Sequence, residues 1–179
     1  MATFTSNSIQ LGTGAQFIGT ANGLSDAPTG TIIQTVIDGT TSNVTANSDG
    51  SYRDILSISF TPRRSNSKII YSIMFNAYCH NGSSNTSNGA SYLVLRDSTS
   101  IKKGDWTFYL NNSSYTRDFY PTVNIFGFDQ PNTTSTISYK LQGRKYGGNS
   151  SNFATVFGEA QADSVLGNSV VMKIEELSV

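Results

Sequence analysis

The chain has 179 residues, 13% of them charged, and a formal net charge of zero at pH 7. This length suffices for one domain with a real hydrophobic core, and the lack of net positive charge argues against a nucleic-acid partner. Disorder of the whole chain is excluded as well, because 11% of the residues are aromatic and apolar residues alternate with polar ones over long stretches.

Cysteine content and hydrophobic runs set further limits. Cys79 is the only cysteine, so no disulfide can form within the chain. No stretch approaches the roughly 20 apolar residues of a membrane span. The first eight residues, MATFTSNS, contain neither a basic segment nor an apolar run, so they do not have the pattern of a signal peptide. We therefore expect synthesis in a cytoplasm and no membrane insertion.

Residues 1–28 differ from the rest of the chain. They contain no Lys, Arg or Glu, and their apolar residues are isolated among small polar ones. Several glycines interrupt any helix there. Such a segment cannot bury much surface alone, which leaves two alternatives: a flexible tail, or an ordered arm laid against other subunits. We expect an N-terminal arm over 1–28 and one domain over 29–179.

Strand patterns then follow one another with turn residues between them. Most of these segments alternate apolar and polar residues or are rich in β-branched and aromatic side chains. No window has a convincing helical stripe, although 159–166 could hold one short turn. About nine strands and many polar loops predict an all-β fold, an antiparallel β-sandwich or jelly roll. The expected strands are 30–37, 55–60, 68–78, 92–96, a short one around Ile101, 123–128, 136–142, 153–157 and 169–175.

The longest pattern lies over 68–78, after a turn that begins at Pro62. One of its faces is wholly apolar and must be buried, with Ile69, Tyr71, Ile73, Phe75 and Ala77 in alternate positions. The other face is mixed and could be covered by a second surface, including another subunit. We therefore name a candidate core or oligomer-interface strand with Tyr71, Ile73, Phe75 and Tyr78.

Catalytic and metal-binding patterns are weak. His80 is the only histidine, and its neighbour Cys79 should point to the opposite face of a strand, so the two do not form a nucleophile pair. The carboxylates are scattered, and the nearest approach to a calcium loop is Asn47, Asp49 and Asp54. No glycine-rich loop leads from a strand into a helix. We expect no enzyme activity, no metal and no cofactor.

Aromatic residues gather instead among Asn, Ser and Asp over 105–119 and next to the glycine-rich loop at 146–151. Sugar-binding sites use this combination, because a ring covers the apolar face of the sugar while polar groups bind its hydroxyls. The same residues can equally fill a core or a subunit interface. The candidate contacts for a glycan or receptor are Trp106, Tyr109, Tyr115 and Tyr146.

Five segments, taken in order, resemble segments of tailed-bacteriophage virion proteins. The resemblance extends from residue 28 to residue 177, and the opening segment follows a Pro-x-Gly-x-Ile/Val-Ile/Val-Gln pattern. The segments are 28–35 (PTGTIIQT), 58–70 (ISFTPRRSNSKII), 95–101 (LRDSTSI), 128–141 (FDQPNTTSTISYKL) and 171–177 (VMKIEEL).

This resemblance implies a compact β-sandwich like the heads of tumour necrosis factor and C1q, which are usually trimeric. Its members are tail-fibre tips, receptor-binding heads or capsid decorations. We therefore expect a non-enzymatic virion protein, a homotrimeric fibre head or a capsid or tail appendage, which could contact the host surface. The N-terminal arm would bind other virion proteins, after synthesis in the bacterial host cytoplasm. The alternative is a lectin-like module that binds a host glycan.

Overall fold

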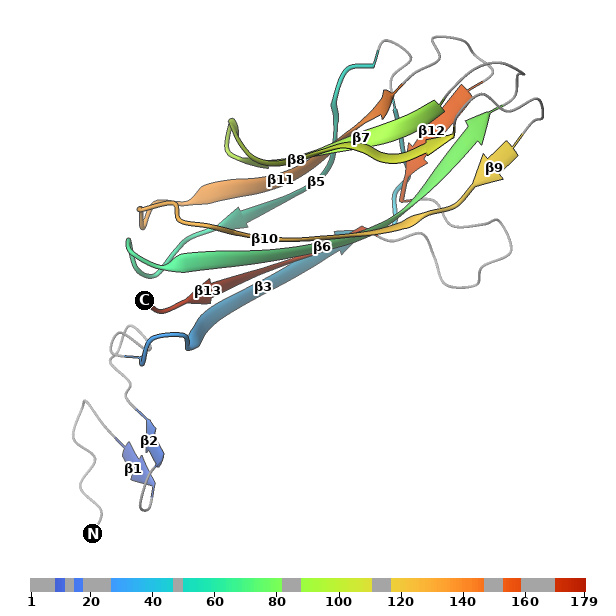
Figure 1. Cartoon of the computed structure of the whole chain (residues 1–179). Helices are drawn as coiled ribbons and strands as arrows, with labels where there is room; N and C mark the ends of the chain where they lie inside the picture. Colours follow the sequence, from blue (N-terminus) through green and yellow to red (C-terminus); the bar gives the residue numbers. More distant parts are fainter. Residues whose placement is uncertain are drawn as a thin grey trace.

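The computed structural model describes residues 9–11, 15–17, 27–46, 50–81, 88–110, 117–146, 153–158 and 170–179. All regular secondary structure in these ranges is β-strand (Figure 1). Within the same ranges, no helix is long and apolar enough to cross a membrane. The strands are β1 (Ile9–Leu11), β2 (Ala15–Phe17), β3 (Ile32–Thr40), β4 (Val44–Thr45), β5 (Arg53–Phe60), β6 (Lys68–Asn81), β7 (Asn88–Arg96), β8 (Thr99–Leu110), β9 (Arg117–Phe119), β10 (Thr122–Asp129), β11 (Ile137–Tyr146), β12 (Phe153–Phe157) and β13 (Val170–Leu177).

Two antiparallel sheets face each other (Figure 1). In the larger sheet, β6 is flanked by β13 and β10 along its first part and by β12 and β9 along its last part. The strands β3 and β4 extend this sheet by pairing with β13 and β12. The smaller sheet has the order β5-β11-β7-β8. β1 and β2 form a separate two-stranded sheet.

The order of the eight main strands is that of a jelly roll. Taken along the chain, they are β3, β5, β6, β7, β8, β10, β11 and β13. One sheet has the order β3, β13, β6, β10, which are the first, eighth, third and sixth of these strands. The other has the order β5, β11, β7, β8, which are the second, seventh, fourth and fifth. Two Greek keys of this kind bring strands far apart in sequence side by side. The prediction of an all-β antiparallel sandwich is confirmed.

One hydrophobic core fills the space between the sheets, and aromatic rings form much of it. Tyr139 of the smaller sheet contacts Phe60 and Tyr71, with ring centroids 6.4 and 6.5 Å apart. Phe75 meets Phe157 edge to face at 5.9 Å. All five side chains are almost fully buried. Each large buried side chain stabilises the fold by roughly 1.5–3 kcal/mol relative to an exposed one.

Two glycines allow these rings to lie directly against backbone, Tyr71 against the neighbouring strand β10 and Phe157 against β11 of the facing sheet. A Cβ atom at Gly127 would lie 2.2 Å from the Tyr71 hydroxyl oxygen, and one at Gly143 would lie 2.4 Å from the Phe157 ring. Neither distance is compatible with a side chain. The core packing therefore requires glycine at both positions.

The structure has more strand than the sequence predicted. β6 continues through His80 and Asn81, and β7 begins at Asn88, so both ends of the loop expected over 80–89 are strand. β8 extends to Leu110, into a segment expected to be irregular. Polar residues and glycine disfavour strands locally, but pairing with neighbouring strands overrides that preference, on both edges of β6 and β7 and on one edge of β8. The helical turn considered for 159–166 lies outside the described residues.

A β-bulge changes the expected face of β5. The alternation predicted that Leu56, Ile58 and Phe60 share the buried face. A register shift between Leu141 and Gln142 leaves Ile55 as the extra residue opposite them. Ile55 is consequently buried along with Ile58 and Phe60, whereas Leu56 is only half-buried. The extra residue interrupts the alternation of β5, so a strict period of two cannot predict which side chains beyond it are buried.

The two ends of the sandwich differ in what they carry. We call the end that carries the C-terminus the near end and the opposite one the far end. At the near end, the residues just before β3 are hydrogen-bonded to the C-terminal segment. Gly30 N–H donates to Ser178 O (2.8 Å), and Ser178 N–H donates to Thr31 O (2.9 Å). At the far end, Asn81 closes β6 and pairs with β12 and β9. The 14 residues of β6 separate these ends by about 45 Å. The boundary expected near residue 28 stays a prediction.

A buried carboxylate fixes the turn that connects β5 and β6 at the near end. Glu176 of β13 is fully buried. Its Oε1 accepts hydrogen bonds from Arg63 N (2.9 Å), Arg64 N (3.0 Å) and Ser67 Oγ (2.7 Å), and its Oε2 also accepts from Arg63 N (2.9 Å). The last strand of the chain thus satisfies the donors of a turn about 110 residues earlier in the sequence.

We expect Glu176→Ala to lower the free energy of unfolding by about 3 kcal/mol, because one buried and two part-buried donors lose their acceptor. Urea denaturation at fixed protein concentration measures the change. The control is Asp54→Ala on the smaller sheet, where an exposed carboxylate pairs with Lys140 (3.0 Å) and accepts a hydrogen bond from Gln142 (2.6 Å). That change should cost less than about 1 kcal/mol. Equal losses in the two variants would contradict a special role for the buried carboxylate.

Candidate functional site

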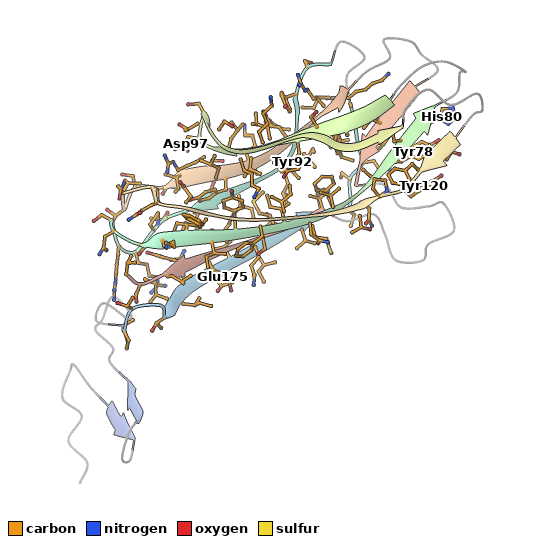
Figure 2. All side chains as sticks on the ribbon, in the orientation of Figure 1. Tyr78, His80, Tyr92, Asp97, Tyr120 and Glu175 are labelled. Carbon is orange, nitrogen blue, oxygen red and sulfur yellow. The ribbon has the colours of Figure 1, made fainter. Side chains whose placement is uncertain are left out.

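The outer face is the surface of the larger sheet that points away from the core. Alternate residues of β3, β13, β6, β9 and β10 build it, because successive side chains of a strand point to opposite sides. Figure 2 shows side chains projecting from this sheet on both sides. Along β6, the outer face divides into an apolar half toward the near end and a polar–aromatic strip toward the far end.

The apolar half consists of large hydrophobic side chains that solvent reaches. Their exposed fractions range from 45% to 67%. They come from the first strand of this sheet (β3), from its central strand (β6) and from the strand beyond it (β10), so they extend across the sheet. The residues are Ile32, Ile37, Met74, Phe126 and Phe128.

The strand register brings these residues together. Met74 lies between Val171 of β13 and Asn124 of β10, and in the next row Lys173 and Phe126 flank β6. A groove of about 330 Å³ lies among these side chains. A second hollow of about 410 Å³ lies beside it, lined by both exposed phenylalanines of β10 and by residues of β6 and β8. The apolar half is therefore uneven enough to receive side chains of another surface.

The charges within the apolar half are compensated. Lys173 pairs with Glu175 along β13 at 3.0 Å. The ammonium group of Lys68 lies over the ring of Phe128, 5.1 Å from its centroid. Covering this part of the sheet would therefore bury one compensated ion pair, Lys173 with Glu175, while the ammonium group of Lys68 would keep its charge against the Phe128 ring.

The polar–aromatic strip consists of three side-chain pairs at the far end. Figure 2 labels its rings, Tyr78, Tyr120 and His80. In the first pair, the hydroxyl of Thr122 donates to Asn76 Oδ1 at 2.8 Å. In the second, the rings of Tyr78 and Tyr120 stack at a centroid distance of 5.0 Å. In the third, His80 Nδ1 lies 2.6 Å from Asp118 Oδ1. The strip is therefore Asn76, Tyr78 and His80 from β6, opposite Thr122, Tyr120 and Asp118.

The three rings of the strip form one stack. Tyr78 lies between Tyr120 and His80, and its ring centroid is 6.2 Å from that of His80. Tyr78 also donates its hydroxyl to Asp118 Oδ1 at 3.0 Å. Two groups of the stack thus hold one carboxylate, which fixes its orientation.

Hydrogen bonding sets the charge of that carboxylate. The hydrogen bond from His80, with a smaller contribution from Tyr78, lowers the pKa of Asp118 below its usual 3.8. The side chain is nevertheless 48% exposed. Asp118 is therefore an ionised, oriented and solvent-accessible acceptor at neutral pH.

Cys79 and His80 point to opposite sides of β6, as the sequence predicted. Cys79 is fully buried, and burial raises the pKa of its thiol to about 11. Its Sγ lies 3.9 Å from Thr155 Oγ1. A thiol with such a pKa is not a nucleophile at neutral pH.

The candidate strand residues divide between the two faces of β6. Tyr71, Ile73 and Phe75 are buried in the core of the chain itself. Tyr78 lies on the outer face, within the polar–aromatic strip. A contact of this strand with another subunit stays a prediction.

The aromatic candidates for glycan contact lie on other elements. Trp106 and Tyr109 belong to β8, and Tyr146 ends β11. Tyr109 and Tyr146 are both in register with Gly89 of β7, on either side of it. They are therefore two strand spacings apart, about 10 Å. Tyr115 lies outside the described residues, and none of the other three is part of the polar–aromatic strip.

Sequence reasoning missed the exposed phenylalanines and the pairing of His80 with Asp118. The first could have been found, because residues 123–128 carry apolar side chains in both alternate sets and thus predict a second covered face. The second depends on the pairing of β9 with β6, 38 residues apart in the chain. No local pattern indicates it.

No metal centre is formed by the described residues, which contain no cluster of three or more His, Cys, Asp or Glu side chains. In the calcium loop considered from the sequence, Asp54 contacts Lys140 (3.0 Å) and Gln142 (2.6 Å), and the other two residues lie outside the described ranges.

No protein-family model matches the chain, and no curated protein matches it either. Among solved structures, it is similar to infectious bursal disease virus Gx strain, with 12% identity and a TM-score of 0.34 over 94% of this chain and 41% of that one. It is also similar to the VP2 subviral particle of that virus, with 12% identity and a TM-score of 0.36 over 96% and 42%. The chain spans about two-fifths of these proteins, and a likeness of this size carries no argument about function.

We expect His80→Ala to raise the pKa of Asp118 toward 3.8, because the largest cause of its lowering is removed. Carboxyl ¹³C NMR during a pH titration measures this. In the unchanged chain the interaction stabilises the fold above the ordinary carboxyl pKa, and this stabilisation is lost as the pH falls through the lowered value. Asp54, whose pKa is lowered mainly by Gln142, is the internal control and should not move. An unchanged Asp118 titration would contradict the pairing.

Proposed function

We propose that the protein is a non-enzymatic structural protein of a tailed-phage virion: a homotrimeric fibre head, or an appendage of the capsid or tail, that could contact the host surface. The observation that carries the proposal is the apolar half of the outer face, with its five large exposed hydrophobic side chains. A solvated protein rarely leaves such side chains together unless another surface covers them.

A further copy of the same chain is the occupant we propose for this surface. The formal net charge is zero, so no long-range repulsion opposes the approach of identical chains. Within the apolar half, Glu175 compensates the charge of Lys173, and the ammonium group of Lys68 lies over the ring of Phe128. Interfaces between identical subunits have apolar centres of this kind.

A closed trimer agrees with the extent of the surface. The exposed residues lie on β3 on one side of the larger sheet and on β10 on the other. Different parts of the patch can thus contact two neighbours at once, and a rotation that closes the ring prevents open-ended growth. The ordered resemblance of five segments to phage virion proteins, whose heads are usually trimeric, supports three copies.

The place in a virion rests on that same resemblance, together with the jelly-roll strand order that it implied. In this proposal, residues 1–28 form the arm that binds other virion proteins, and the sandwich is the exposed head. The scattered carboxylates and the high pKa of Cys79 support a role without catalysis.

We expect Phe126→Glu combined with Phe128→Glu to convert trimers to monomers, because two charges would be buried in the interface. Light scattering measures the solution mass. The control is Ser59→Glu, which adds a charge at an exposed position of β5 in the other sheet and should leave the trimer intact. A trimer that survives the double change would contradict the proposed interface.

The mass of the full chain, compared with a chain that starts at Ala27, tests the role of the arm. Trimers from both would place the contacts in the sandwich and leave the arm for attachment. If only the full chain were trimeric, the arm would be required for trimer formation. Monomers from both would overturn the fibre-head proposal.

A further inference from the structure

We propose that the polar–aromatic strip binds a neutral pyranose sugar, with the apolar face of the sugar on the tyrosine stack and its hydroxyls on Asp118 and Asn76. The chemistry of the strip carries this inference by itself. Only the statement that the strip faces outward from a particle rests on the proposed function.

The ring stack provides the platform. Tyr120 stacks on Tyr78 at a centroid distance of 5.0 Å and exposes 41% of its surface. A pyranose presents a patch of C–H groups that packs against such a ring. Because Tyr78 is itself held by its hydrogen bond to Asp118, little side-chain freedom is lost when a sugar binds.

The carboxylate provides the acceptor. Both hydrogen bonds to Asp118, from His80 and from Tyr78, go to Oδ1. The other oxygen, Oδ2, belongs to a half-exposed side chain whose orientation these two bonds fix. A carboxylate oxygen can accept from sugar hydroxyls, and bonds to a charged acceptor are stronger than neutral ones.

The side-chain amide of Asn76, on the other side of the rings, provides a donor that complements the carboxylate of Asp118. Asn76 Oδ1 accepts from the Thr122 hydroxyl at 2.8 Å, which leaves the Nδ2 group to donate. An acceptor at one side of the stack and a donor at the other are what a ring of hydroxyls requires, since each hydroxyl both donates and accepts.

The charge of the strip selects for neutral sugars. Asp118 is ionised at neutral pH, and no described lysine or arginine side chain belongs to the strip. The carboxylate of an acidic sugar would therefore meet a like charge. Glucose-like, galactose-like or mannose-like units fit, whereas uronic and sialic acids do not.

The position of the strip suits contact with an external surface. It lies at the far end of β6, whereas the N-terminal segment joins the sandwich at the near end, beside Ser178. If residues 1–28 attach the head to a particle, the strip is at the end directed away from it. The apolar half lies between these two ends, so a trimer formed through it would present three strips in the same direction.

Saturation-transfer difference NMR on the full chain tests the inference. The probes are the methyl glycosides of glucose, galactose, mannose, rhamnose and N-acetylglucosamine, with methyl glucuronide as the acidic comparison. We expect transfer to the ring C–H protons of at least one neutral glycoside and none to the glucuronide. Tyr120→Ala and Asp118→Asn should each weaken binding about tenfold or more.

The matched control for the carboxylate is Asp54→Asn. Asp54 is also exposed, and hydrogen bonds also lower its pKa, but its partners are Gln142 and Lys140 on the smaller sheet. That variant should bind as the unchanged protein does. Thermal unfolding and solution mass of each variant establish that it is folded and assembled as before.

Three results would overturn the inference: no transfer to any of the neutral glycosides, undiminished transfer in Tyr120→Ala, or preference for the glucuronide. The result is independent of the oligomeric state. A monomer that binds a neutral sugar would remove the fibre-head proposal and keep the sugar site. A trimer that binds no sugar would do the reverse.

Discussion

The structure depends on one strand that is hydrogen-bonded along both edges. β6 pairs with β13 and β12 on one side and with β10 and β9 on the other, over a length of 14 residues. A strand held in this way cannot slip by one residue without moving every side chain to the wrong face. Its odd-numbered residues therefore build the core, and its even-numbered residues build the outer face. The buried rings of Tyr71 and Phe75 fix the register for both faces at once.

The two parts of the outer face follow from a change of residue type along that strand. Near the start of β6 the outward residues include Ile70 and Met74, and near its end they are Tyr78 and His80. The strands beside β6 change in the same direction. Phe128 lies opposite Ile70 near the start of β6, and Asp118 lies opposite His80 near its end. One continuous sheet can thus combine a surface suited to other copies of the chain with a surface suited to a polar ligand. The two need not compete, because rigid pairing keeps them apart.

The sequence was sufficient for the fold class and for the buried face of β6, because both depend on local alternation. It was insufficient wherever a distant strand decided the outcome. The bulge that buries Ile55 is visible only in the pairing of β5 with β11, and the length of β6 beyond Tyr78 depends on partners that support polar residues in a strand. The pairing of His80 with Asp118 follows from strand order alone. The aromatic residues of 105–119 were predicted to contact a glycan from their composition, yet composition contains no information about which rings meet.

The buried position of Cys79 has a practical consequence. It is the only thiol in the chain, it has no exposed surface, and it belongs to the strand on which both sheets are organised. A thiol reagent can reach it only when the far part of the sandwich separates from its neighbours. The rate of labelling therefore reports how often that part opens, without any engineered probe. Labelling of Cys79 therefore measures local opening of the larger sheet.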